Sequence, residues 1–305
     1  MEVSVIVKCT GLTKQYKKNT VVKQASFQME KGHIYGLVGP NGAGKTTIMK
    51  MLAGMTPVDE GWIEFFGTSE RLDHSRQRMS FMIEAPYIDK SMTARNNMMQ
   101  IRFLRGVADE QKVDEILELV GLSDAGKKLA GKFSMGMRQR LGIGMALLAS
   151  PEILVLDEPV NGLDPEGIVD VRNLLRKLSM EENVTILISS HLLAELSELC
   201  TDYIFIHRGE ILETISEEDL KKKCRQYLSI KTTNLSGSIA ALEKQYNIRD
   251  YRVIEEEELM LYEMTDRLEE VSRTITEQGD AILHFVLMGE SLEDYYLEKV
   301  GDQNA

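Results

Sequence analysis

Residues 39–46 read Gly39-Pro40-Asn41-Gly42-Ala43-Gly44-Lys45-Thr46 and match the pattern G-x-x-x-x-G-K-[ST]. They follow an apolar strand predicted at 34–38 and lead into a helix predicted at 46–52. Glycines let successive backbone N–H groups face inward as a cradle for phosphate oxygens, and the helix start adds the positive end of its dipole. The stretch therefore predicts a phosphate-binding loop.

The side chains that end this loop have separate predicted roles. Lys45 should reach the β- and γ-phosphates of a nucleotide, and the Thr46 hydroxyl should coordinate Mg²⁺. Thr47 is expected to add a phosphate hydrogen bond. The loop alone indicates nucleotide binding and leaves the reaction open.

Two acids follow a second apolar strand, predicted at 153–156. Ligands of parallel sheets bind beyond the carboxyl ends of the strands, where Asp157 and Glu158 stand. We expect Asp157 to hold Mg²⁺, partly through water. Glu158 is the expected general base for the attacking water, a role worth roughly 10² to 10⁴ in rate. A purely structural acid pair is the alternative, but two charges beside a buried strand are costly without a cation.

Strands and helices alternate along the first part of the chain, which predicts a mostly parallel, covered sheet. The predicted strands are 3–7, 21–29, 34–38, 63–66, 79–83, 153–156 and 184–189, and 203–215 is a predicted hairpin. The predicted helices after the first are 94–103, which Thr93 would cap, 113–120, 139–149, 165–178 and 192–199. Beyond 222 the predicted order is strand, helix, two strands, helix and strand, followed by a last helix at 291–300. That order is typical of a small split-βαβ domain.

A further motif, Phe133-Ser134-Met135-Gly136-Met137-Arg138-Gln139-Arg140, opens a helix before the acidic pair. Here the chain resembles the ATP-binding-cassette (ABC) ATPases, whose signature reads roughly L-S-G-G-Q. Ser134 and Gly136 match, whereas Phe133, Met135 and Met137 depart from the commonest form. In the family these residues contact the γ-phosphate of ATP held by the opposite subunit. The resemblance therefore implies a dimer, formed with a second copy or a homologous ATPase subunit.

Other marks of the family occur in the expected order. The loop 161–165, Asn-Gly-Leu-Asp-Pro, resembles the one that crosses the dimer interface, and His191 resembles the histidine that senses the γ-phosphate. Tyr16 stands where the family places an aromatic ring against adenine. A lone histidine after a strand, or a lone tyrosine, is more often structural, and the order of the whole set favours the functional interpretation.

The resemblance implies an α/β fold with ATP and Mg²⁺ as cofactors. Residues 1–222 are expected to form a P-loop ABC ATPase core, with a mixed, mainly parallel sheet, an antiparallel β subdomain and a helical subdomain at about 86–150. Residues 223–305 are expected to form a small α+β ferredoxin-like domain.

Position 84 departs from the family, which usually has glutamine there. Glu84 only accepts hydrogen bonds when ionised, and as a Mg²⁺ ligand it would add negative charge near the triphosphate. A conservative swap is the alternative. With Glu84, the following segment 91–103 and the form of the signature at 133–139, the chain resembles the bacitracin-resistance and lantibiotic-immunity exporters, which also carry a C-terminal extension. That likeness suggests an antimicrobial peptide as the substrate.

Composition restricts the partners. The formal net charge of −12 argues against nucleic acid as the main ligand. The sequence shows no apolar run long enough to span a bilayer and no secretory signal, so any membrane role must come from another polypeptide. The resemblance implies that this is an integral permease and that the chain lies at the cytoplasmic face of the membrane.

Three alternatives stay open at this point. A soluble ABC ATPase acting on ribosomes or DNA usually has two cassettes or a long coiled-coil insertion, and this chain shows neither. A P-loop kinase would not account for Ser134, Gly136 or His191. A degenerate, inactive subunit is at odds with the intact Lys45 and Glu158.

Overall fold

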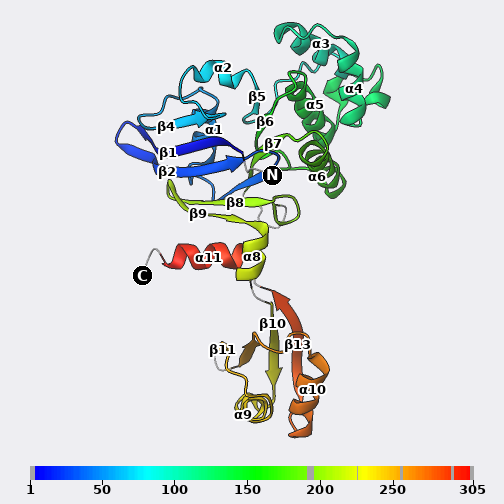
Figure 1. Cartoon of the computed structure of the whole chain (residues 1–305). Helices are drawn as coiled ribbons and strands as arrows, with labels where there is room; N and C mark the ends of the chain where they lie inside the picture. Colours follow the sequence, from blue (N-terminus) through cyan, green and yellow to red (C-terminus); the bar gives the residue numbers. More distant parts are fainter. Residues whose placement is uncertain (1–3, 191–195, 225, 255–256, 290–291, 303–305) are drawn as a thin grey trace. The chain divides into compact units, whose positions relative to one another are not determined.

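The computed structural model describes residues 4–190, 196–224, 226–254, 257–289 and 292–302. The chain folds into two compact units, Met1–Glu217 and Glu218–Ala305. Each unit is described by itself, and Figure 1 labels their elements.

A six-stranded sheet with the order β5-β6-β7-β3-β8-β9 forms the centre of the first unit. Its strands are β3 (Ile34–Val38), β5 (Met79–Met82), β6 (Ile153–Asp157), β7 (Thr185–Ser190), β8 (Asp202–His207) and β9 (Glu210–Ser216). The first five strands in the sheet order run parallel, and β9 returns antiparallel to β8. All residues of β3, β6 and β7 are buried, which confirms that both faces of the sheet are covered.

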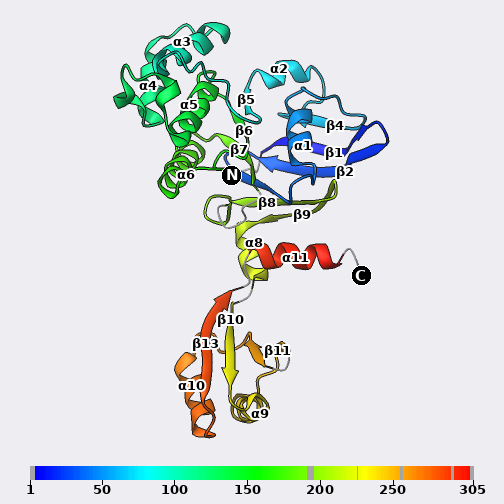
Figure 2. The ribbon, with the colours of Figure 1, turned by 180° about the vertical axis from the view of Figure 1, so that it is seen from behind.

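A second, antiparallel sheet with the order β2-β1-β4 packs over the first. It consists of β1 (Val5–Tyr16), β2 (Asn19–Glu30) and β4 (Glu60–Phe65). Helix α1 (Lys45–Leu52) lies between the two sheets in Figures 1 and 2, and its apolar side chains share one core with both.

The strands β1 and β2 are longer than the sequence predicted. Each has 12 residues, whereas strands were expected only at 3–7 and 21–29. The apolar alternation of β1 is interrupted because the inward-pointing Lys14 is buried through an ion pair of 2.7 Å with Asp59, and because the pairing with β2 contains register shifts.

The part of the chain predicted to be helical, about 86–150, contains α3 (Ala94–Leu104), α4 (Gln111–Leu119) and α5 (Met135–Leu147), with short 3₁₀ turns at Ser123–Ala125 and Ala130–Lys132. Helix α6 (Pro165–Met180) follows β6 and packs on α5 and β7. The expected N-cap of α3 is confirmed, because the Thr93 hydroxyl accepts a hydrogen bond of 3.2 Å from the Asn96 N–H. The short helix α2 (Leu72–Arg76) had not been predicted.

The second unit contains a four-stranded antiparallel sheet with the order β11-β12-β10-β13. Its elements are α8 (Glu217–Lys223), β10 (Gln226–Thr232), α9 (Leu235–Tyr246), β11 (Tyr251–Ile254), β12 (Glu258–Leu261), α10 (Leu268–Glu277), β13 (Ile282–Gly289) and α11 (Leu292–Asp302). From β10 to β13 the order is the predicted βαββαβ, and this sheet order is that of a split βαβ unit. The boundary expected at 222 falls inside α8. No helix in the described ranges has the length and apolar character needed to cross a membrane.

Candidate nucleotide site

The phosphate loop joins the buried end of β3 to the start of α1. Gly42 and Gly44 have φ angles of 81° and 110°, which L side chains rarely adopt. Gly44 is the N-cap of α1, and no side-chain hydrogen bond caps this helix start. The first-turn N–H groups of α1 therefore have no side-chain cap. They are available to donate hydrogen bonds to an anionic ligand.

Gly39 fixes the loop against strand β8. A Cβ atom at Gly39 would lie 2.3 Å from the Ile206 carbonyl oxygen, so any other residue would push the loop away from the sheet. The Gly209 N–H, just after β8, donates to the Ala43 carbonyl at 3.0 Å. The cradle therefore lies directly against β8 and the turn that follows it.

Lys45 is buried at the centre of the loop, with 5% of its surface exposed. Its Nζ donates to the carbonyl oxygens of Gly39 at 2.6 Å and Pro40 at 3.2 Å, and lies 4.0 Å from Glu158 Oε1. Burial lowers the pKa of the Lys45 ammonium, and the charges of Glu158 and Asp157 act in the opposite direction. The lysine therefore links the phosphate loop to the acidic edge of the sheet.

The two acids stand at the carboxyl end of β6, as predicted. Asp157 is buried, and its Oδ1 accepts a hydrogen bond of 2.6 Å from the hydroxyl of Ser189 on β7. The same hydroxyl accepts from the Glu158 N–H at 3.0 Å. Glu158 has a φ of 49°, so the chain turns directly after the strand, and its Oε2 accepts from Asn161 Nδ2 at 3.0 Å. Both carboxylates are oriented by neighbours rather than left loose in solvent.

Glu84 belongs to the same edge of the sheet. The last residue pair of β5 and β6 is Met82 with Leu156, so Glu84 follows its strand at the height of the acidic pair. Its carboxylate lies 2.8 Å from Nζ of Lys50 on α1. The hydrogen bond and charge of Lys50 hold the pKa of Glu84 below its usual value. The structure pairs Glu84 with Lys50, and the Mg²⁺ role of Glu84 stays a prediction.

Two further candidates lie at the margins of this group. Tyr16 ends strand β1 with 46% of its surface exposed, and its hydroxyl oxygen is 3.5 Å from that of Thr56. A ring in that position can stack on a flat ligand. His191 lies outside the described residues, and its predicted role stays a prediction.

Ser134 and Gly136 lie at a different place, the start of α5. Ser134 is exposed, and its hydroxyl accepts a hydrogen bond of 3.2 Å from the Met137 N–H. Gly136 packs beside the start of α6, where an added Cβ would lie 3.6 Å from Gly167 Cα. No hydrogen bond or ion pair joins Ser134 to residues 39–47 in the described part of the chain. The signature motif is therefore outside the cluster formed by Lys45 and the acids.

Ser189, Lys50 and the hydrogen bond of the Asn161 side chain were not predicted from the sequence. Ser189 had a usable signal, because it ends the strand predicted at 184–189, and the carboxyl ends of parallel strands meet at the edge where Asp157 was expected. Lys50 had a weaker one: it follows Thr46 by four residues and so shares its face of α1. Neither signal predicts which side chain the residue contacts.

The oxygen atoms at the phosphate loop suit Mg²⁺ better than a metal whose ligands all come from protein side chains. No group of three or more histidine, cysteine or acidic residues that could hold a metal occurs among the residues described. Mg²⁺ is commonly bound by one or two carboxylates together with substrate phosphates. A hydroxyl at Thr46 and a carboxylate at Asp157, both beside the phosphate loop, fit that pattern.

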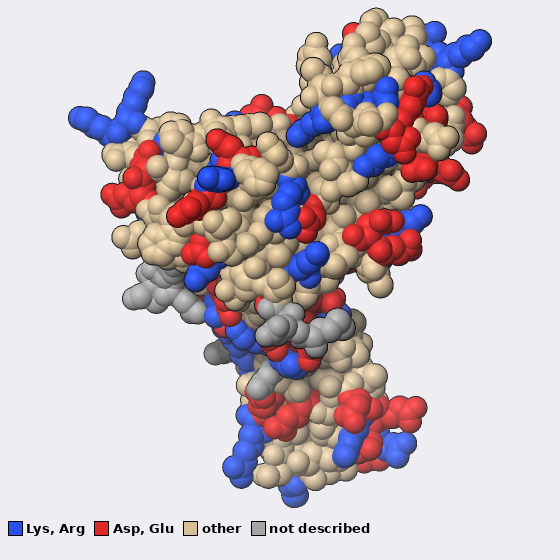
Figure 3. Space-filling view, turned by 45° about the horizontal axis from the view of Figure 1, so that its top comes forward, with Lys and Arg blue, Asp and Glu red and all other residues tan. Residues whose placement is uncertain are grey.

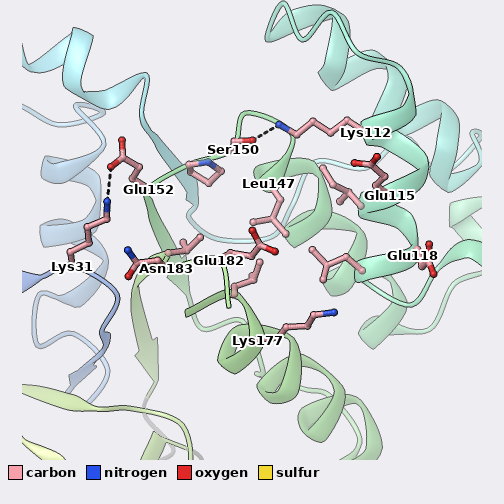
Figure 4. Close-up of a pocket in the computed structure, with 15 residues that line it drawn as sticks. Lys31, Lys112, Glu115, Glu118, Leu147, Ser150, Glu152, Lys177, Glu182 and Asn183 are labelled. Atoms are coloured by element: carbon pink, nitrogen blue, oxygen red, sulfur yellow. Dashed lines mark hydrogen bonds and ion pairs between the residues drawn. The ribbon is translucent and has the colours of Figure 1, made fainter. Parts of the chain in front are cut away.

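A separate cavity of about 570 Å³ lies at the opposite edge of the large sheet (Figure 4). Its lining includes Pro151 and Val184, which precede β6 and β7, whereas the phosphate loop follows the end of the parallel strand β3. An ion pair of 3.5 Å between Lys31 and Glu152 stands at its rim. This cavity is not part of the nucleotide site.

Comparison with known proteins decides the family. The family model described as ABC transporter matches residues 22–161, a range that holds the phosphate loop, Ser134 and both acids. The chain is 39% identical over 300 residues to the bacitracin transport ATP-binding protein BcrA of Bacillus licheniformis, with 98% of each chain covered. This protein belongs to the ABC transporter family.

Other relatives agree with this assignment. This chain is 40% identical over 207 residues to the lantibiotic transport ATP-binding protein SrtF of Streptococcus pyogenes. The match covers 68% of this chain and 89% of that protein. A crystal structure of the ADP conformation of an ATP-binding cassette shares the fold at a TM-score of 0.65, with 24% identity, over 72% of this chain and 94% of the other. The protein is thus an ATP-binding ATPase subunit of a transporter, and the predicted α/β ABC fold is confirmed.

Proposed function

We propose that this ABC subunit hydrolyses ATP between two cassettes and thereby drives a separate membrane permease that removes a peptide antibiotic from the cell. The observation that carries the catalytic part is the cluster of Lys45, Asp157 and Glu158 around the phosphate loop. In a subunit that does not bind a nucleotide, burying these charged groups would cost free energy of folding without a compensating function.

The residues of the loop would bind the triphosphate. Backbone N–H groups of the loop and of the first turn of α1 would face the phosphates, and Lys45 would exchange its two carbonyl acceptors for β- and γ-phosphate oxygens. Thr47 adds a hydrogen bond, and the Tyr16 ring stacks on the adenine. Glu158 accepts a proton from the attacking water, held in position by Asn161 and by the turn after β6.

Mg²⁺ would be held by the Thr46 hydroxyl and by Asp157, with Glu84 as the additional carboxylate at the same edge. The ion supplies charge neutralisation at the phosphate oxygens when it is bound. The hydrogen bond from Ser189 restrains the Asp157 carboxylate, which fixes the direction from which it can contact the ion or its water.

The opposing cassette would complete the site through Ser134 and Gly136. Ser134 is exposed at a helix start, where a hydroxyl and first-turn N–H groups can meet a γ-phosphate from outside the chain. The loop 161–165 adjoins this helix start, because a Cβ at Gly162 would lie 3.2 Å from Met135 Cε. His191 is the proposed γ-phosphate sensor. The partner cassette is a second copy or a homologous subunit.

The membrane partner and the substrate class rest on the relatives. BcrA is named for bacitracin transport and matches over 98% of this chain, so the likeness includes residues 223–305 as well as the proposed ATPase domain 1–222. SrtF is named for lantibiotic transport. We therefore place the subunit at the cytoplasmic face of the membrane, bound to an integral permease, with an antimicrobial peptide as the transported substrate.

A susceptibility experiment tests the substrate. A strain lacking this chain should become more sensitive to bacitracin or to a lantibiotic, and wild-type chain but not Glu158→Gln should restore resistance. A cell-wall inhibitor of unrelated structure serves as the control. Unchanged sensitivity to every peptide in the panel would remove the substrate claim and leave the ATPase assignment in place.

Purification from membranes tests the partner. The proposal predicts one integral protein that stays bound to the chain in detergent. Recovery with ribosomes or DNA would favour the alternative of a soluble ABC ATPase. Basic and acidic side chains are interspersed on the face shown in Figure 3, where no large basic patch suited to a nucleic acid is visible.

A further inference from the structure

The ion pair of Glu84 and Lys50 joins two segments that the nucleotide site needs. Glu84 begins the segment after β5, and Lys50 lies on α1, 34 positions earlier in the chain. The two charged atoms are 2.8 Å apart. Glu84 holds a φ of 66°, a left-handed conformation that is uncommon for a residue with a side chain, so its backbone turns at this point.

Lys50 lies close to the acidic residues of the nucleotide site. It is one turn beyond Thr46 and therefore on the same face of α1. The hydrogen bond to Glu84 raises the pKa of the Lys50 ammonium, and the charges of Glu84 and Asp157 act in the same direction. The side chain is one-third exposed, so it can still reorient when a nucleotide enters.

A carboxylate at position 84 creates an electrostatic problem that a neutral amide would not. Asp157 and Glu158 already carry negative charge at this edge, and ATP adds three to four more. A carboxylate that is free to approach the phosphates would repel them. The ion pair with Lys50 neutralises the charge of Glu84 and restrains the position of its carboxylate.

We propose that Lys50 is a positioning residue that holds Glu84 against α1, so that the triphosphate can bind beside a carboxylate. The inference rests on the proposed nucleotide site at 39–47. Two simpler accounts make different predictions. If Lys50 only attracts phosphate through its own charge, its effect does not depend on residue 84. If the pair only stabilises the fold, nucleotide affinity does not depend on it.

A double-mutant cycle separates these accounts. The full-length chain is prepared as wild type, Lys50→Met, Glu84→Gln and the double variant, and binding of a fluorescent ATP analogue is measured in EDTA, where no metal contributes. Lys50→Met should weaken binding by about 5-fold in the wild-type background, the upper range for an exposed ion pair. In the Glu84→Gln background the same change should cost less than about 2-fold, because no carboxylate is released.

Controls make the result specific. Lys50→Arg should keep wild-type affinity, and Lys31→Met removes a comparable exposed charge from the pair with Glu152 and should leave affinity unchanged. Ligand-free thermal unfolding should be nearly the same for all variants, because the pair is exposed.

Equal losses in both backgrounds would contradict the inference, and so would a loss matched by Lys31→Met. Absence of analogue binding by the wild-type chain would instead contradict the proposed function, which keeps the two failures distinct.

Discussion

Two helix starts in the first unit are assigned to phosphate, and they differ in what they already contact. The start of α1 has no side-chain cap, a glycine with a positive φ angle at its N-cap and a buried lysine that contacts the adjoining loop. The start of α5 is exposed and capped by its own Ser134. The first therefore has all of its proposed phosphate-binding groups within one chain, whereas the second is proposed to meet the nucleotide of a partner.

The glycines show the same difference. Gly39 cannot accept a Cβ, because the Ile206 carbonyl oxygen is 2.3 Å away, whereas a Cβ at Gly136 would make an ordinary contact of 3.6 Å. The fold therefore requires a glycine in the phosphate loop. It does not require one at 136, where an added methyl group would face Gly167 of the same chain.

The largest expected effect comes from removing the lysine at the start of α1. Lys45→Ala should weaken ATP binding by roughly 10- to 100-fold, because hydrogen bonds to charged groups are worth about 1.5 to 3 kcal/mol. Equilibrium binding of a fluorescent ATP analogue measures this, and circular dichroism checks the fold. Binding within a factor of two of wild type would show that α1 is not the phosphate site.

The next effect should separate the two helix starts. Ser134→Ala should lower steady-state ATPase by about 10-fold while leaving ATP binding to the single chain unchanged, because the lost hydroxyl acts on the γ-phosphate of a partner. The loss of its cap should also cost about 1 kcal/mol of unfolding free energy.

A matched cap serves as the control for Ser134. Asn234 caps α9 in the second unit through a hydrogen bond of 3.1 Å from the Gly237 N–H. Asn234→Ala should cost similar stability and spare the ATPase. Equal ATPase losses in both variants would mean that Ser134 acts only as a cap.

The smallest effect concerns Gly136. Gly136→Ala should leave the fold intact or stabilise it by up to about 0.5 kcal/mol, since the site accepts a methyl group within a helix. ATPase should nevertheless fall several-fold, measured at saturating MgATP. A stabilised protein with full ATPase would argue against close approach of a second cassette at α5.

Much of the site could be predicted because its elements are local. The phosphate loop is specified by eight consecutive residues. The strand Ile153–Asp157 is predicted by an apolar run that ends in acidic residues. Thr93 and Ser134 were likewise predicted as helix starts from side chains next to their helices. In each case the physical cause lies within one turn or one strand.

The rest depends on contacts between distant segments. The Ser189 hydroxyl contacts Asp157 only because β6 and β7 pair in register, and Lys50 contacts Glu84 only because α1 lies beside the end of β5. The length of β1 was missed because the burial of Lys14 requires Asp59, 45 positions away. No pattern in a single stretch specifies such partners.

The central claim is that ATP is held between two copies of this fold, and the mass of the Glu158→Gln protein in MgATP tests it most directly. Without its general base this variant should accumulate with ATP bound, and light scattering should give twice the 34.5 kDa of one chain. A mass that stays at 34.5 kDa while ATP is demonstrably bound would contradict the pairing of two copies of this chain and leave only a homologous subunit as the second cassette.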